Sequence, residues 1–344
     1  MRTVSGAGRR TNVALLAVLA AALVSGVLAF AVGSEAAVRV VVIVHGVAGL
    51  CVVLLAPWKS VIVRRSLRRS HGWPQLASVA LAVLTVVVVA TGIAHAMGAT
   101  GLLLGVTSMQ IHVGAAVVAT LLVLEHARRH RPRLRRTDVG RRSLLRAGTL
   151  TGGGVLLWST TEATARLASL PGADRRATGS HEQGTDDPER MPVTQWFTDA
   201  VPVLDLETFR LDLHGARAVS LDVRELDPSD TVRATLDCTG GWYAEQDWSG
   251  IRLDRLLSGS VGVPSRTCSV DVISVTGYRR RLPIEDAGRL LLATHVAGRP
   301  LRAGHGAPLR LVAPGRRGFW WVKWVTRVDV VDTPWWWQPP FPLQ

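Results

Sequence analysis

The sequence predicts a protein in two parts, an all-α transmembrane bundle followed by a mainly β domain of the α+β class. Two observations carry this prediction. Apolar runs long enough to cross a bilayer are confined to the first 130 or so of the 344 residues. From residue 196 onward, short runs of alternating apolar and polar residues are separated by turn residues, which is typical of strands.

The distribution of charge supports the same division. Residues 1–146 carry 18 Lys and Arg against 3 Asp and Glu, a formal charge of +15. The whole chain carries +14, so −1 remains for residues 147–344. The second part is therefore nearly neutral, and the basic residues serve membrane topology, not the binding of nucleic acid.

Four transmembrane spans are predicted within a helical domain that covers residues 1–137. Arginine-rich loops follow the second and the fourth span, and the latter loop has nine arginines between Arg128 and Arg146. By the positive-inside rule both loops and the amino terminus are cytoplasmic, which predicts a multi-pass protein of the cell membrane. The predicted spans are 12–33, 38–57, 74–97 and about 104–127.

Residues 138–168 contain a twin arginine, Arg141-Arg142, followed by a moderately apolar stretch rich in Gly and Thr. This pattern is similar to a twin-arginine translocation signal and predicts a weak fifth span that delivers the rest of the chain to the outside. A basic cytoplasmic loop that runs into an ordinary amphipathic helix is the alternative.

Residues 169–195 are rich in Pro, Gly and charge without periodicity, which predicts a linker. The β domain then covers residues 196–333, with helices expected only near 251–258 and 284–288. The remaining residues, 334–344, form a tail with three consecutive tryptophans from Trp335. Such a cluster favours a membrane interface, and packing against the domain is the alternative. The clearest expected strands lie at 209–215, 219–223, 232–238, 268–277, 309–315 and 322–331.

Cys238 ends the alternating run VRATLDC and is followed by the strand breaker Thr239-Gly240-Gly241. A thiol at the end of a rigid strand is placed to bind a transition metal or to act as a nucleophile. Taken alone, the pattern is more typical of a small buried hydrophobic residue.

Four segments in order, DWSGIRL, TGYRRRLPIEDA, LLATHVAGRPL and HGAPLRLVAPGRRGFWWVKWV, resemble the sulfite oxidase superfamily of molybdenum enzymes. That superfamily also contains the periplasmic methionine sulfoxide reductase. The resemblance implies a sulfite-oxidase-type molybdopterin domain in which Cys238 binds molybdenum beside one molybdopterin. It departs from the sulfite-oxidising pattern, because Thr239 and Gly240 stand where those members have a Gly-Asn pair.

The resemblance also assigns the residues of the cofactor site. His305, Arg310 and Lys323 match pterin-contacting positions, and a guanidinium is suited to a phosphate. Tyr243 is a hydrogen-bond donor for substrate, and no arginine directly follows Cys238, so a neutral sulfoxide or N-oxide is expected in preference to sulfite. The remaining candidates are Gly315 and Gly318, which let the backbone approach the ring system, and Asp199.

Histidines inside the predicted spans are candidates for function. His45 and His112 have small neighbours, VHGVAG and QIHVGAA, and are predicted to be the axial ligands of one haem b, with His95 as the substitute. Histidines that hydrogen-bond between the helices of a plain anchor are the alternative. A haem on the outer side could exchange electrons with quinone.

These observations together predict a membrane-anchored molybdopterin oxidoreductase with its catalytic domain outside the cytoplasm. Its expected partners are an S- or N-oxo substrate, a redox partner such as quinone, and the lipid bilayer. A cofactor-free binding or sensory module with the same fold, and the same enzyme on a haem-free anchor, are the competing hypotheses.

Overall fold

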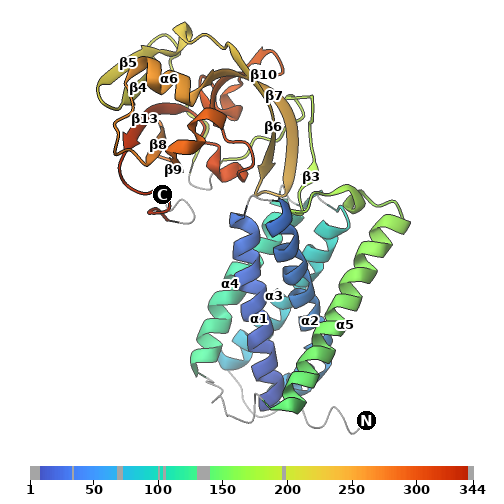
Figure 1. Ribbon diagram of the computed structural model, residues 1–344. Coiled ribbons are helices and arrows are strands. Elements are labelled where there is room, and N and C mark those ends of the chain that lie inside the picture. The colour runs from blue at the N-terminus through green and yellow to red at the C-terminus, as the bar shows by residue number, and fades with distance from the viewer. Residues whose placement is uncertain are drawn as a thin grey trace. The chain divides into compact units, whose positions relative to one another are not determined.

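In the computed structural model the chain forms two compact units (Figure 1). The first, mainly helical unit comprises residues 1–30 and 35–181, and the second comprises residues 31–34 and 182–344. The residues described are 8–32, 35–67, 73–99, 101–103, 106–129, 140–195 and 199–339. The first three residues of the predicted β domain, 196–198, lie outside this set.

The first unit contains five long helices, and four of them are long and apolar enough to cross a membrane. This confirms the four predicted apolar helices. Their surfaces expose large apolar side chains, for example Val86 at 67% and Leu121 at 62%, as expected when lipid is the solvent. The helices are α1 (Arg9–Ala31), α2 (Glu35–Leu67), α3 (Trp73–Ala96), α4 (Ser108–Arg129) and α5 (Arg141–Leu167), and a small hairpin of β1 (Leu102–Leu103) and β2 (Val106–Thr107) precedes α4.

Helix α5 begins at the twin arginine and packs against α2 through small residues. The thiol of Cys51 donates to the carbonyl of Leu150 at 3.4 Å, and a Cβ atom at Gly154 would lie only 2.5 Å from the Cys51 sulfur. Gly46 of α2 likewise makes room for the indole of Trp158. Close contact through glycine is typical of helices that pair inside a membrane. By composition, however, α5 is not among the four candidate spans.

The second unit is built around two β-sheets and confirms the mainly β prediction. The six-stranded sheet has the order β11-β10-β7-β3, with β12 paired to β10 and β6 to β7. Its strands are β3 (His181–Glu182), β6 (Asp230–Cys238), β7 (Trp242–Arg252), β10 (Leu291–Val296), β11 (Arg299–Pro300) and β12 (Arg310–Val312). The five-stranded sheet has the order β5-β4-β13-β8-β9 and consists of β4 (Arg210–His214), β5 (Ala218–Asp222), β8 (Ser269–Ser274), β9 (Arg279–Pro283) and β13 (Val325–Val331).

Short helices occur near both predicted places, α6 at Leu253–Ser260 and a 3₁₀ turn at Ile284–Arg289. In α6 the buried residues Leu253, Leu256 and Leu257 lie on one face, which fixes the helix against the domain. Further 3₁₀ turns are found at Pro171–Asp174, Val223–Glu225, Ala303–His305 and Gly318–Trp320.

Two segments of the second unit have a structure that their sequence patterns do not predict. The longest strand, β7, was not among the expected strands, because Glu245, Gln246 and Asp247 interrupt its apolar pattern. The segment after residue 182, for which composition predicts a linker, is packed against the domain, and the side chain of Met191 is 3% exposed. This segment contributes directly to the site described next.

Candidate functional site

Cys238 lies at the tip of the hairpin formed by β6 and β7, where it pairs with Trp242. The turn between them needs Gly241, whose φ of +90° favours glycine. Two polar groups lie beside the sulfur: the backbone N–H of Gly240 donates to it at 3.3 Å, and the Thr194 hydroxyl is hydrogen-bonded to it at 3.3 Å. These two contacts fix the direction of the sulfur. The half-buried sulfur is therefore held in place as a ligand would be.

A buried ion pair supports the strand end that carries this cysteine. Arg317 is 4% exposed and donates through Nη1 to a carboxylate oxygen of Asp237 at 2.5 Å. Its other terminal nitrogen is 3.5 Å from the carbonyl oxygen of Cys238. Gly318 lies so close that a Cβ atom there would be 3.1 Å from the Cα of Cys238. Sequence reasoning missed Arg317 and Asp237, because 80 residues separate them.

Strand β12 and the loops around it bring together His305, Arg310 and Lys323. This grouping is what a common role in binding the pterin requires. Nη1 of Arg310 donates to the carbonyl of His305 at 3.0 Å, and Nζ of Lys323 donates to the carbonyls of Gly304 at 2.5 Å and Thr194 at 2.8 Å. Gly306 separates the two cations, and a Cβ there would be 2.9 Å from that of Arg310 and 3.2 Å from that of Lys323. The predicted set therefore occupies one place in the fold.

Desolvation dominates the electrostatics of this cluster. Burial, with the neighbouring Arg310, lowers the pKa of Lys323 to about 7. Burial also lowers the pKa of Arg310 to about 10, although attraction from Cys238 acts in the opposite direction. The same burial and the charge of Arg310 lower the pKa of His305 to about 4. Burying a charged group is unfavourable unless an opposite charge pairs with it. Burial of Arg310 and Lys323 therefore favours the binding of an anion beside them.

Several buried nitrogen atoms of the site have no hydrogen-bond partner among the described residues. Nε of Arg310 and the indole nitrogen of Trp242 are donors, whereas Nδ1 of His305 is an acceptor, because Nε2 of this neutral ring donates to the Met191 carbonyl. The Arg310 guanidinium also stacks over the indoles of Trp248 and Trp321, at 5.1 and 5.7 Å from the ring centroids. Buried nitrogen atoms are nearly always paired in folded proteins, so the cluster presents unused binding capacity.

The structure does not bring Tyr243 to the thiol. Tyr243 pairs across the hairpin with Asp237, whereas Trp242 pairs with Cys238. Since successive residues of a strand point to opposite faces, Tyr243 shares the face of Asp237 and Trp242 that of Cys238. A Cβ atom at Gly240 would lie 3.5 Å from the Cys238 sulfur and 3.7 Å from the Trp242 nitrogen. The indole N–H of Trp242 is thus the donor on the face of the thiol.

The other predicted residues have different roles. Asp199 accepts a hydrogen bond from the Thr276 hydroxyl at 3.2 Å, and its charge acts on Lys323. Gly315 has a φ of +76° and opens the turn that leads to Arg317, while Gly318 allows the close approach to the cysteine strand. Both glycines shape the loop and bring its backbone to the site.

His45 and His112 lie together in the first unit, with ring centroids 5.9 Å apart. Nδ1 of His45 lies 2.9 Å from the carbonyl of Ala22, and Nδ1 of His112 lies 2.8 Å from that of Val88. These contacts place a proton on each Nδ1 and leave each Nε2 with a lone pair for a metal. Gly26 and Gly92 make room for the two rings.

His95 occupies a different environment. Its Nε2 lies 2.9 Å from the carbonyl of Gly179, and its Nδ1 lies 3.5 Å from the Ser108 hydroxyl. Its ring meets that of His181 edge to face at 4.8 Å. Both ring nitrogens of His95 are thus engaged, so it fits a ligand role less well than His45 and His112.

Comparison with known proteins agrees with the geometry of the second unit. Residues 198–337 match the family model described as "Oxidoreductase molybdopterin binding domain". This part of the chain is therefore an oxidoreductase domain of the molybdopterin-binding kind. It belongs to the sulfite oxidase and MsrP family, and helices with four candidate spans precede it.

Mitochondrial sulfite oxidase of Rattus norvegicus is 31% identical over 166 residues, which cover 38% of this chain and 30% of the relative. The "Protein-methionine-sulfoxide reductase catalytic subunit MsrP" of Xanthomonas campestris is 31% identical over 113 residues, 28% of this chain and 35% of that protein. The chain thus spans about a third of the length of these relatives. The solved structure of sulfane dehydrogenase SoxCD from Paracoccus pantotrophus is 26% identical, with 39% and 40% of the chains covered and a TM-score of 0.37.

The residues present fit the cofactor that this family implies. Molybdopterin ends in a phosphate, and the unpaired, desolvated Nε of Arg310 is a donor suited to such an anion. The oriented sulfur of Cys238 is a soft ligand suited to a transition metal.

Proposed function

We propose that this chain is a membrane-anchored molybdopterin enzyme that transfers an oxygen atom on an S- or N-oxo substrate outside the cytoplasm. Electrons are exchanged with quinone through the membrane helices. The observation that carries the proposal is that one domain holds an oriented thiol, Cys238, together with two buried cationic side chains: Arg310, whose Nε has no partner among the described residues, and Lys323.

Different residues at this site bind the metal, position the metal ligand and bind the phosphate end of the cofactor. Cys238 binds the metal through sulfur, and Thr194 and Gly240 hold that sulfur in one direction. Arg310 and Lys323 bind the phosphate end of the cofactor, and His305 contacts the pterin. When bound, the cofactor supplies two-electron oxygen-atom transfer, and the protein supplies ligation, orientation and electrostatics. The Trp242 indole on the same face as the thiol is placed to donate a hydrogen bond to a substrate oxygen.

A neutral oxo substrate suits the charges around the cysteine better than sulfite does. Arg317 is the arginine in contact with the cysteine backbone, yet Asp237 neutralises it, so the pair offers no net charge to an anion. The turn residues after Cys238 carry no cation either. We expect a higher kcat/KM for a sulfoxide or N-oxide than for sulfite, and sulfite turnover above that of every sulfoxide tested would contradict this choice.

A haem b between His45 and His112 would provide the electron path. Metal–imidazole bonds are about 2.0 Å long, so two imidazoles on one metal have their ring centroids about 6 Å apart. The observed 5.9 Å supports this ligand pair. A metal-binding histidine usually donates its other ring N–H to a carbonyl or carboxylate, which fixes the ring, and the Nδ1 contacts of His45 and His112 with backbone carbonyls match this arrangement.

The proposed location rests on the charge asymmetry of the loops and on α5. With the arginine-rich loops in the cytoplasm, a fifth crossing by α5 would place the catalytic domain outside. The packing of Gly154 against Cys51 supports a crossing alongside α2 despite the modest apolarity of α5. Protease protection of residues 182–344 in right-side-out and inverted vesicles tests the orientation.

Elemental analysis and a visible spectrum on one detergent preparation of the full chain test the proposed function. We expect one molybdenum per chain and the absorption bands of a six-coordinate b-type haem. Protein without molybdenum would favour a cofactor-free binding or sensory module. Molybdenum without haem bands would instead leave the enzyme on a plain helical anchor.

A further inference from the structure

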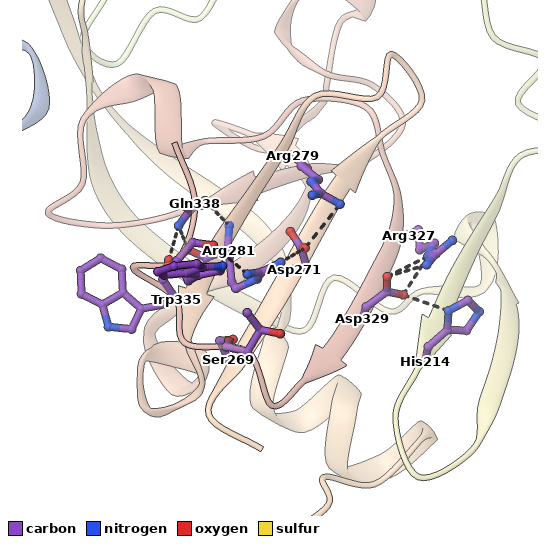
Figure 2. A network of polar contacts seen from close by, with 11 residues as sticks. His214, Ser269, Asp271, Arg279, Arg281, Arg327, Asp329, Trp335 and Gln338 are labelled. Atoms are coloured by element: carbon purple, nitrogen blue, oxygen red, sulfur yellow. Dashed lines mark hydrogen bonds and ion pairs between the residues drawn. The ribbon is translucent and has the colours of Figure 1, made fainter. Parts of the chain in front are cut away.

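The C-terminal tail, residues 334–339, is fastened to the free edge of the five-stranded sheet. That edge is β9, and the side chain of Gln338 takes the place of a neighbouring strand. Its amide oxygen accepts from the backbone N–H of Arg281 at 3.0 Å, and its amide nitrogen donates to the Arg281 carbonyl at 2.7 Å. The same nitrogen donates to the carbonyl of Trp335 at 2.5 Å, which closes the tail on itself (Figure 2).

Arginine side chains hold the tail backbone from the other direction. Nη1 of Arg281 donates to the carbonyl of Trp337 at 3.0 Å, and Nη1 of Arg280 donates to that of Pro339 at 3.2 Å. Arg281 is in turn fixed by Asp271 at 3.0 Å, as Figure 2 shows. The backbone of the tail is therefore bound to the sheet edge, and its indole side chains take no part in these hydrogen bonds.

The three tryptophans separate into two environments. Trp335 packs edge to face on Trp320 at 6.3 Å, with the Arg316 guanidinium 5.4 Å from its ring. Trp336 and Trp337 contact each other at 5.9 Å and remain 62% and 70% exposed. A pair of large indoles held in solvent by a fastened backbone marks an interaction surface.

The surroundings of the pair indicate the partner. Arg279, 61% exposed on the same strand edge, has only a weak ion pair at 3.9 Å with Asp271, whose carboxylate is already bound by Arg281. Of the arginines that contact the tail, Arg281 is paired with Asp271 and Arg316 with Asp286, while Arg280 is buried. Arg279 is therefore the exposed cation that this strand offers to a partner. Tryptophan favours the headgroup region of a bilayer, and arginine favours anionic headgroups.

We propose that Trp336 and Trp337 insert into the headgroup region of a lipid bilayer, with Arg279 facing anionic headgroups. The apolar helices of the first unit keep the domain near a membrane, so a weak lipid contact is enough to orient it. The inference rests on insertion of those helices and is independent of the proposed substrate and cofactors.

The test uses the full chain labelled with 5-fluorotryptophan in lipid nanodiscs. Fluorine resonances are assigned by Trp336→Phe and Trp337→Phe, and their broadening is measured with a headgroup-nitroxide lipid and with a water-soluble gadolinium chelate. We expect the resonances of residues 336 and 337 to lose most of their intensity with the nitroxide lipid and little with the chelate. In discs with phosphatidylglycerol, Arg279→Gln should reduce the loss, whereas in pure phosphatidylcholine it should not.

Two internal residues serve as controls in the same spectra. Trp248 is fully buried in the second unit and should respond to neither reagent, while Trp58 of α2 should be broadened by the nitroxide lipid. Broadening of residues 336 and 337 by the chelate, or protection from both reagents because a protein face covers them, would overturn the inference. If the nitroxide lipid does not broaden the resonance of Trp58, the helices themselves are not inserted in the bilayer. The same spectra therefore distinguish a failure of helix insertion from a failure of the tail to contact lipid.

Discussion

The two candidate redox sites of this chain are built in opposite ways. His45 and His112 come from two regular helices, each ring contacting one backbone carbonyl and facing one glycine of a neighbouring helix. The site at Cys238 is assembled from the segment near Thr194, the hairpin at residue 238 and the loops from 304 to 323. The first site depends on shape and the second on charge, so the same kind of substitution should affect them differently.

The largest effect is expected from Cys238→Ser. An alcohol is a poor ligand for a metal that a thiolate binds. Losing a residue that only holds a metal ligand in place costs up to about 100-fold, so losing the ligand itself should lower turnover by more than that. Haem absorption should be unchanged, because the first unit does not depend on this thiol. Activity assays and spectra on the same preparation measure both. Cys268→Ser is the matched control, since its sulfur only donates to the carbonyl of Asp332; retained activity in Cys238→Ser would refute the site.

Replacing the membrane histidines should have the converse effect. His45→Ala or His112→Ala removes one of the two proposed haem ligands, and we expect loss of the six-coordinate haem bands with an unchanged molybdenum content. His95→Ala should keep those bands, because both ring nitrogens of His95 are engaged elsewhere. Visible spectroscopy and elemental analysis decide between the pairs. Bands that survive in His112→Ala and vanish in His95→Ala would mean that the ligand pair is wrong.

A smaller loss is expected from Arg317→Met. The substitution removes the guanidinium that pairs with the buried Asp237 carboxylate, and breaking a buried ion pair in this way costs about 3–5 kcal/mol. The cysteine strand would lose its support, and molybdenum affinity or activity should fall by about 10–100-fold. Thermal unfolding and metal content measure the two effects.

The double variant Arg317→Met with Asp237→Leu separates positioning from stability. Removing both charges should restore much of the stability, because the carboxylate that paired with Arg317 is then removed together with it. If Arg317 only stabilises the fold, activity should recover with stability. If it positions Cys238, as the contact with that residue's carbonyl suggests, activity should stay low in the stable double variant.

Sequence patterns predicted the parts of this molecule that depend on local periodicity. The apolar helices follow from their length, and β6 with its terminal Cys238 follows from alternation. The grouping of His305, Arg310 and Lys323 came from a family resemblance, since nothing in their spacing shows that Gly306 lets them meet.

What sequence reasoning missed depends on contacts between distant segments. Strand β7 carries polar residues at 245–247 because each has a partner. The carboxylates of Glu245 and Asp247 face Arg233 of β6, and the Gln246 amide donates to the Gly184 carbonyl. The apparent linker supplies the Thr194 and Met191 carbonyls to the site, a role that its Pro- and Gly-rich composition conceals. Neither feature has a local signal, so each required the fold.

The most modest expected effect concerns Lys323 and the pH dependence of stability. Its folded pKa of about 7 lies below the ordinary value of 10.5, so between these values the unfolded chain binds a proton that the folded chain rejects. Cofactor-free protein should therefore become more stable as pH rises from about 7 to 10.5, by about 2–4 °C in Tm per kcal/mol gained. Only one other lysine, Lys59, is present in the chain.

Lys323→Met isolates this contribution. The variant removes a desolvated cation, so at pH 7 its cofactor-free form should melt at a higher temperature than the parent chain, and the rise in Tm with pH should be reduced. Molybdenum content should nevertheless fall, because the anion loses a donor. Arg289→Met, at a guanidinium 67% exposed, should change neither quantity. At the Cys238 site, a buried charge therefore lowers the stability of the cofactor-free protein while it favours cofactor binding. Substitution of His45 or His112 should not raise stability in this way. A lower Tm in Lys323→Met than in the parent chain would contradict this difference between the two sites.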